Sequence, residues 1–214
     1  MAVYTLFGQP ANPAAIVADT SGYTLGVQWS VTLTAGQTGT LTTTWFNSAS
    51  GAGSLPSQMG LWTVSGPVLV ASQAASWFGA AGSGWASAAW SSPPVLVSGT
   101  VYTLGVFDNA GTNWYSDTAG YWTTGPGSGG VTNGPLSAPN NAGASPGQDS
   151  FIVTGSLAFP NSSGNGANYW IDPEVTVTGG NVQQPIPADQ MTASGGDLYA
   201  AVWGRGYISR RGWA

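Results

Sequence analysis

The sequence predicts an all-β fold, a β-sandwich of jelly-roll type, on three observations. Apolar residues alternate with small or polar residues in several segments, as in strands that bury one face. Turn signals rich in glycine and proline separate these segments at short intervals. No stretch repeats apolar residues at helical spacing. Strands of this kind pack as two sheets around one core, and 214 residues suffice for one such domain with terminal extensions.

The strands are predicted in chain order from these patterns. Residues 24–33 alternate strictly, with the apolar positions Leu25, Val27, Trp29, Val31 and Leu33. Residues 41–46 are dense in β-branched and aromatic side chains. Ser65-Gly66-Pro67 is a tight-turn signal, which predicts a hairpin between its flanking segments. The other predicted strands are residues 59–64, 68–71, 101–107, 151–159 and 169–178.

Three segments fall outside the strand pattern. Residues 1–22 lack periodicity and contain two prolines, so we predict an N-terminal arm. Residues 125–149 are rich in Gly, Pro, Asn and Ser, which predicts a functional or mobile loop. The β pattern stops after Gly180. The predicted organisation is an N-terminal arm (1–22), a β-sandwich domain (23–179) and an extended C-terminal docking tail (180–214).

The composition excludes most site chemistry. The chain has no lysine, histidine or cysteine, and only three arginines carry positive charge. This removes the commonest general base, thiol nucleophiles, disulfides, zinc-thiolate sites, Schiff bases and P-loops. The net charge of −5, with only 5% charged residues, argues against nucleic acid and anionic membranes, and no transmembrane segment is expected. We predict no enzyme activity and no cofactor.

Two groups of oxygen-bearing side chains are candidate sites. Asp172 and Glu174 lie two apart, so both are expected on one strand face, where a two-carboxylate glycosidase would need them. The favoured interpretation is a solvent-facing strand end broken by Pro173, so no catalytic residue is predicted. An oxygen-rich loop suits calcium, but Asx residues also make turns and the EF-hand spacing is missing. No metal is therefore predicted at this loop, which holds Asp108, Asn109, Asn113 and Asp117.

The eleven tryptophans have three competing interpretations: core, protein interface and glycan platform. Alternation within strands predicts that Trp29, Trp45 and Trp62 lie in the core. Aromatic pairs in or beside turns, including Tyr169-Trp170, could instead stack on sugars or anchor a partner. The predicted ligand-binding residues are Trp114, Tyr115, Tyr121 and Trp122.

The last residues combine aromatic side chains with every basic residue of the chain. One interpretation is a solvated, disordered end. The other is a docking arm, because arginine pairs bidentately with carboxylates and aromatic rings supply buried area. Such an arm would bind a neighbouring subunit of an acidic homo-oligomer, or an acidic scaffold such as a capsid lattice. The predicted docking residues are Trp203, Arg205, Tyr207, Arg210, Arg211 and Trp213.

Three segments carry a family resemblance. They are Gly60-Leu61-Trp62-Thr63 through Leu69-Val70-Ala71-Ser72, Gly84-Trp85 followed by Pro94 to Tyr102, and Asn168 to Asp172. In order and spacing, over residues 24–178, they resemble a family of bacterial extracellular β-sandwich domains of unassigned function. The resemblance implies a β-sandwich. Members accompany carbohydrate-active or adhesive modules in secreted proteins, and similar domains occur in virion proteins of phages infecting actinobacteria.

The predicted location follows from two observations that point to different compartments. The composition, rich in Thr, Ser, Gly and Trp, is typical of extracellular proteins, yet the N-terminus lacks the pattern of a secretory signal. A virion protein satisfies both observations. We therefore predict a non-enzymatic bacteriophage structural protein, most specifically a capsid decoration protein on the virion surface. It would be a homo-oligomer bound to a major capsid or tail protein. The alternative is a tail-associated or secreted carbohydrate-binding or adhesion module that binds a host surface glycan.

Overall fold

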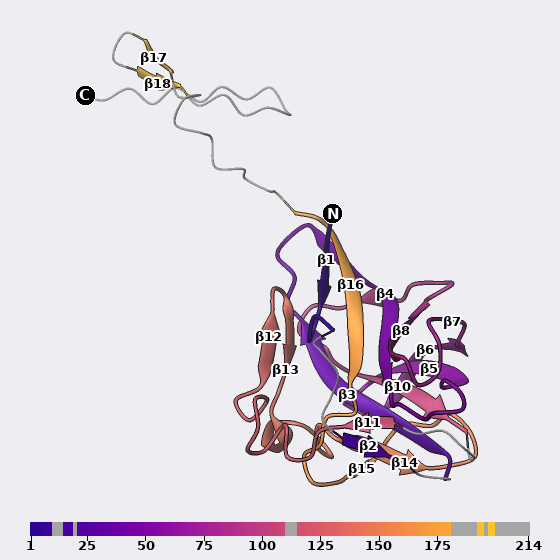
Figure 1. Ribbon diagram of the computed structural model, residues 1–214. Helices are drawn as coiled ribbons and strands as arrows, with labels where there is room; N and C mark the ends of the chain where they lie inside the picture. The colour runs from indigo at the N-terminus through magenta and orange to yellow at the C-terminus, as the bar shows by residue number, and fades with distance from the viewer. Residues whose placement is uncertain (10–14, 19–20, 110–114, 181–191, 195–196, 200–214) are drawn as a thin grey trace. The chain divides into compact units, whose positions relative to one another are not determined.

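The structure is a computed structural model of the chain, and it describes residues 1–9, 15–18, 21–109, 115–180, 192–194 and 197–199. The chain divides into two compact units, Met1–Gly179 and Gly180–Ala214. The described residues of the second unit form the hairpin of β17 (Thr192–Ser194) and β18 (Asp197–Tyr199). The first unit holds all the other strands (Figure 1).

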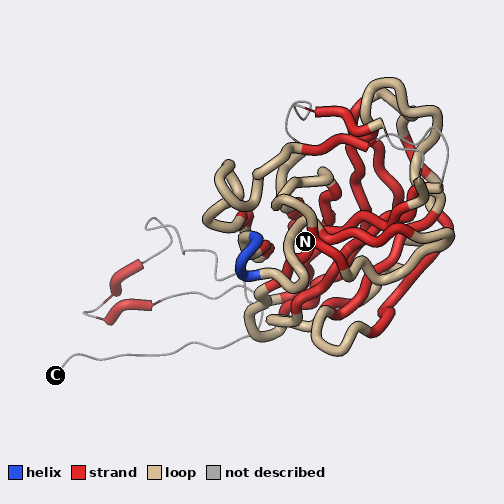
Figure 2. The backbone as a smooth tube through the Cα atoms, turned by 90° about the horizontal axis from the view of Figure 1, so that it is seen from below, coloured by secondary structure: helices blue, strands red, loops and turns tan. Residues whose placement is uncertain are grey.

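The first unit is a sandwich of two antiparallel sheets, which confirms the predicted fold class (Figures 1 and 2). The first sheet consists of β1 (Ala2–Thr5), β2 (Ala15–Val17), β4 (Gln37–Ser48), β7 (Trp77–Phe78), β8 (Gly84–Ala89), β9 (Val95–Leu96), β11 (Tyr115–Asp117) and β16 (Ile171–Gly179). The second consists of β3 (Tyr23–Val31), β5 (Gln58–Thr63), β6 (Val68–Ala74), β10 (Val101–Asp108), β12 (Val131–Asn133), β13 (Leu136–Ala138), β14 (Ser150–Val153) and β15 (Ser162–Ser163).

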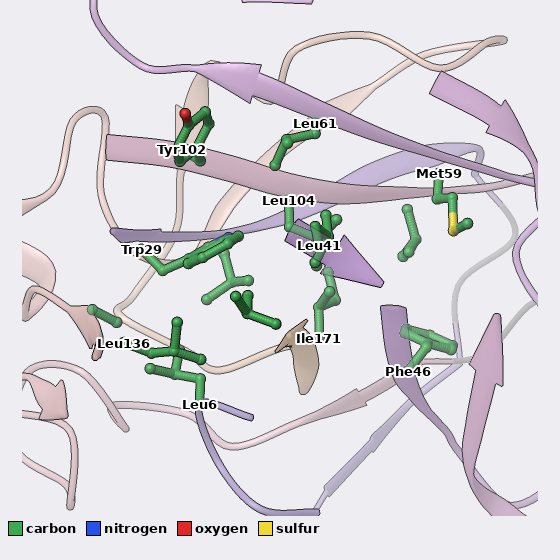
Figure 3. Close-up of a cluster of buried hydrophobic side chains, with 14 of the residues drawn as sticks. Leu6, Trp29, Leu41, Phe46, Met59, Leu61, Tyr102, Leu104, Leu136 and Ile171 are labelled. Carbon is green, nitrogen blue, oxygen red and sulfur yellow. The ribbon is translucent and has the colours of Figure 1, made fainter. Parts of the chain in front are cut away.

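One long strand organises each sheet. β4 pairs with β16, β8, β9 and β11, and β3 pairs with β10, β13 and β14. Alternating side chains from the two sheets interdigitate between them. Trp29, Leu61 and Leu104 enter from the second sheet and Phe46 and Ile171 from the first, all at most 1% exposed (Figure 3).

The three tryptophans predicted for the core lie in different parts of the sandwich. Trp29 is fully buried in the central cluster, as predicted. Trp62 is buried but follows Leu61, which points into the cluster, so Trp62 lies on the outer face of the second sheet. Trp45 precedes buried Phe46 and lies half-buried on the outer face of the first sheet. Trp62 is therefore buried as predicted, although on the outer face, whereas the assignment of Trp45 to the core was wrong, because its neighbour Phe46 takes the inward position.

The first 22 residues, expected as an arm, contribute two strands. β1 pairs with β16, with Ala2 opposite Val177, and β2 pairs with β11. Leu6, immediately after β1, is 2% exposed and belongs to the core. Two short strands separated by prolines carry too little periodicity to be recognised from the sequence.

Residues 125–149, expected as a functional or mobile loop, also carry ordered structure. They include β12, β13 and a short 3-10 helix, Asn141–Gly143. Gln148 accepts a hydrogen bond from the Gln28 backbone N–H (2.8 Å) and donates one to the Gln28 carbonyl (2.6 Å). Its amide side chain thus takes the place of a neighbouring strand beside β3. No helix in the described residues has the length and hydrophobicity needed to cross a bilayer.

Candidate functional site

The predicted ligand-binding aromatics do not form an exposed platform. Tyr121 and Trp122 are 9% and 1% exposed. Their rings pack edge-on against each other with centroids 4.9 Å apart, and both contact Phe7. Trp170 joins this cluster at 5.3 Å from Tyr121. These rings therefore bind the N-terminal segment of the chain itself, while Trp114 lies outside the described residues.

Tyr115 belongs to a second, partly buried cluster. It packs edge-on against Tyr169 (centroids 5.5 Å apart) and Tyr23 (6.1 Å). Burial raises the pKa of the Tyr169 hydroxyl, and the neighbouring Asp149 carboxylate raises it further. Asp149 is itself buried and accepts hydrogen bonds from Ser163 Oγ (2.5 Å) and the backbone N–H of Gly166 (2.8 Å). The cluster is thus occupied by internal contacts.

Asp172 and Glu174 have the two-residue spacing considered for a glycosidase. Both carboxylates accept hydrogen bonds from other parts of the protein. Asp172 is fully buried, so its expected exposure was wrong; the N-terminal segment covers it. Its carboxylate accepts hydrogen bonds from Leu6 N–H (2.6 Å), Phe7 N–H (3.2 Å) and Gln9 Nε2 (2.8 Å). Burial raises the pKa of Asp172 to about 7, although these hydrogen bonds act in the opposite direction.

The oxygen-rich loop considered for calcium is described only in part. Asp108 is buried, Asn109 Oδ1 accepts a hydrogen bond from Ser57 Oγ (3.2 Å), and Asn113 lies outside the described residues. Burial raises the pKa of Asp117. No group of three or more Asp, Glu, His or Cys able to hold a metal ion occurs among the described residues. The six predicted docking residues of the tail also lie outside them, so their role stays a prediction.

The structure reveals an aromatic surface that the sequence did not. In the register of the first sheet, Ser87 on β8 lies opposite Trp45 on β4 and Phe78 on β7. Trp85 lies two residues from Ser87 on the same strand, and therefore on the same face. We call these four residues, Trp45, Phe78, Trp85 and Ser87, the three-ring site. Phe78 is 86% exposed, and the other three are partly exposed.

Two of the rings are held in fixed positions. Trp45 Nε1 donates a hydrogen bond to Glu174 Oε2 (3.0 Å), and Glu174 Oε1 accepts another from Thr43 (2.9 Å). Trp85 packs edge-on against buried Trp170, with centroids 6.3 Å apart. Rigid, oriented rings bind a partner at low cost in conformational entropy, since little side-chain freedom remains to be lost.

A polar hollow of about 280 Å³ adjoins this site. Asn47, which pairs with Trp85 across the sheet, is one of its lining residues. The others are Ile16, Ser48, Ser50, Gly82, Ser83, Gly84 and Ser116. Asn47 is 2% exposed; its Oδ1 accepts a hydrogen bond from Ser116 Oγ (2.9 Å), whereas its Nδ2 has no partner among the described residues. A buried amide donor without a partner is uncommon and costly.

The sequence contains part of the evidence for the three-ring site, whose residues the sequence analysis did not predict as a site. The alternation of Trp85 and Ser87 with Ala86 and Ala88 indicates that Trp85 and Ser87 share a face. It does not indicate which strands lie on either side of β8. That pairing joins residues about 40 positions apart in the chain, such as Trp45 and Ser87, and only the tertiary structure supplies it.

Comparison with known proteins assigns the chain to a family. A family model described as a domain of unknown function (DUF4082) matches residues 8–171. The match contains the three-ring site, the hollow and all strands of the sandwich except β1 and most of β16. No curated protein matches the chain.

Proposed function

The chain belongs to the DUF4082 domain family, and from that premise we propose that it is a non-catalytic structural protein of a bacteriophage virion, most specifically a capsid decoration protein. The observation that carries the proposal is a set of six exposed, uncharged apolar residues on two segments of the sandwich. Such surfaces mark sites of protein association, because burying them in an interface removes apolar area from water.

We call this set the valine surface; its six residues are 39–64% exposed, and neighbours such as Val68 and Leu69 lie on opposite faces of the edge strand β6. Val64 N–H donates a hydrogen bond to the Val101 carbonyl (3.0 Å), and Val97 N–H donates one to Tyr102 Oη (2.8 Å). These bonds hold the β5–β6 hairpin beside the turn that precedes β10. The surface consists of Val68, Leu69, Val70, Val95, Val97 and Val101.

Strand β6 strengthens the case for association. It ends the second sheet, and its sequence from Val68 to Ala74 contains no charged residue and no proline. Edge strands without charge or proline readily pair with another chain. The opposed carboxylates of a hydrolase find no support at Asp172, whose oxygens are occupied by the N-terminal segment. Both features favour a protein that binds subunits over one that transforms a substrate.

Co-sedimentation with the virus particle tests the proposal. The wild-type protein should sediment with particles, and a double variant, Leu69→Glu and Val97→Glu, should not. Charges there would have to be buried without partners. Val153→Glu is the control, since Val153 is 61% exposed, against 50% for Leu69 and 64% for Val97, but lies on β14, outside the valine surface. Absence of wild-type protein from the particle fraction, or equal binding of the double variant, would refute the assignment.

A second candidate is the tail-associated or secreted carbohydrate-binding module. The three-ring site is the observation that favours it, because exposed aromatic rings bind the apolar faces of sugars. The valine surface and the three-ring site involve different residues, so one protein could attach through the first and bind a glycan through the second.

A further inference from the structure

The three-ring site and the hollow together are large enough for a ligand longer than one sugar ring. Neighbouring strands lie about 4.8 Å apart, so the backbones at Phe78 and Trp45, on either side of Ser87, are separated by roughly 10 Å. From Ser87 to Gly84, at the edge of the hollow, the strand advances by about 10 Å. The rings and the hollow together therefore exceed one pyranose ring.

The hollow supplies polar groups of one chemical kind. Its side chains are amide and hydroxyl groups, with Ile16 as an apolar wall at 52% exposure. The Ser83 hydroxyl donates to the Ala80 carbonyl (2.6 Å) and the Ser116 hydroxyl to Asn47 Oδ1 (2.9 Å), so both oxygens remain as acceptors, while the unpartnered Asn47 Nδ2 is buried beneath the hollow. Polyhydroxylated ligands match such a set, because each sugar hydroxyl can donate a hydrogen bond to a serine oxygen.

Charge narrows the class of ligand. The residues that line the hollow include no ionisable side chain, and the Glu174 carboxylate is bound to Trp45. The three arginines of the chain all lie between residues 205 and 211, outside the described residues. Among the residues that the structure describes, this carboxylate has no neighbouring cation, which disfavours uronic acids, sialic acids and phosphate-containing polymers.

We infer that the three-ring site and the hollow form one glycan-binding surface for a neutral pyranose chain. The inference rests on the carbohydrate-binding candidate function and adds the sugar class and the residues. The C–H face of one sugar packs on Phe78 and Trp85 above Ser87. The next sugar places its hydroxyls in the hollow, where the exposed Ser83 oxygen accepts a hydrogen bond from one of them. Glu174 keeps the Trp45 ring in place and does not contact the ligand.

Affinity gel electrophoresis of the full chain with three polymers tests this inference. The probes are a soluble neutral β-glucan, a soluble N-acetylglucosamine polymer and polygalacturonate as the anionic comparison. Wild-type protein should be retarded by at least one neutral polymer and not by polygalacturonate. Phe78→Ala should weaken retardation about ten-fold, as expected for losing one aromatic contact. Because Phe78 is 86% exposed, this change should leave the thermal unfolding temperature unaltered.

Two further variants make the result specific. Ser87→Tyr places a ring on the floor between Trp45 and Phe78 and should abolish retardation, while Val153→Ala, on the other sheet, should behave as wild type. Neutral-polymer binding that survives both Phe78→Ala and Ser87→Tyr would overturn the site but keep the carbohydrate-binding function. Binding to no polymer would overturn both. Stronger binding to polygalacturonate would overturn the neutral class.

Discussion

The Asp172 carboxylate shows how a single residue can fix a chain terminus. It lies on β16 but binds backbone groups of Leu6 and Phe7, more than 160 positions earlier. Hydrogen bonds from N–H groups favour the ionised form, and removal from water favours the neutral form. Burial dominates, which raises the pKa of Asp172 to about 7. Folding and protonation of this residue are therefore coupled.

The raised pKa predicts a stability that decreases with pH. Between the ordinary value of 3.8 and about 7, the folded protein holds a proton on Asp172 that the unfolded chain has released. The stabilisation is present in full below pH 3.8 and lost as the pH rises through about 7. Urea unfolding should give a smaller free energy at pH 7.5 than at pH 4.5. Asp172→Asn should reduce this difference; a wild-type stability that increases over the interval would contradict the assignment.

At the scale of elements, a row of glycines explains the position of Trp62. Gly26, Gly105 and Gly60 lie opposite one another on β3, β10 and β5. A Cβ added at Gly60 would lie 2.5 Å from the Trp62 ring, and one at Gly105 would lie 3.1 Å from it. The indole thus covers the bare backbone of two neighbouring strands. The Gly-x-Trp spacing of residues 60–62 is a packing motif on the outer face of the sheet.

Substitution of Gly60 tests this packing. Gly60→Ala should lower the free energy of unfolding by about 1–3 kcal/mol, since the methyl group displaces the Trp62 ring. Gly155→Ala is the control, because a Cβ at Gly155 meets no atom within 4 Å. Guanidinium unfolding monitored by tryptophan fluorescence measures both. Equal stability of the two variants would show that Trp62 does not depend on the glycine row.

At the scale of the whole molecule, the two ends of the chain differ in their relation to the sandwich. β1 and Leu6 belong to the first unit by pairing and by burial, and Asp172 holds the residues that follow. The second unit begins at Gly180, after the last strand of the sandwich. Any role of the tail in attachment is thus separable from the folding of residues 1–179.

Truncation at each end should therefore give opposite results. Removing residues 181–214 should change the melting temperature of the sandwich by no more than about 2 °C, because the sheets and core stay complete. Removing residues 1–9 should prevent cooperative folding at 37 °C, because it strips β1 from β16 and uncovers Asp172. Differential scanning calorimetry measures both. A stable protein without residues 1–9 would restore the interpretation of these residues as an arm.

Local patterns determined the longer strands by themselves. Period-two alternation depends on neighbours in the sequence, so residues 24–33, 41–46 and 101–107 identified β3, β4 and β10 and the all-β class. The composition likewise determined which chemistries are unavailable, since a missing residue type cannot be supplied by folding. Short strands such as β1 and β2 were beyond this reach, because three or four residues contain too few alternations.

Tertiary structure decided which side chains share a surface. Tyr121 and Trp122 lie beside a turn and seemed suited to exposure, yet Phe7 from the other end of the chain covers them. Phe78 and Trp45 come together only because β7 and β4 pair with opposite edges of β8. Cross-strand register is a property of residues distant in sequence, and it depends on how the whole set of strands buries its apolar faces. The alternation of one strand specifies its two faces but not the neighbours that meet it there.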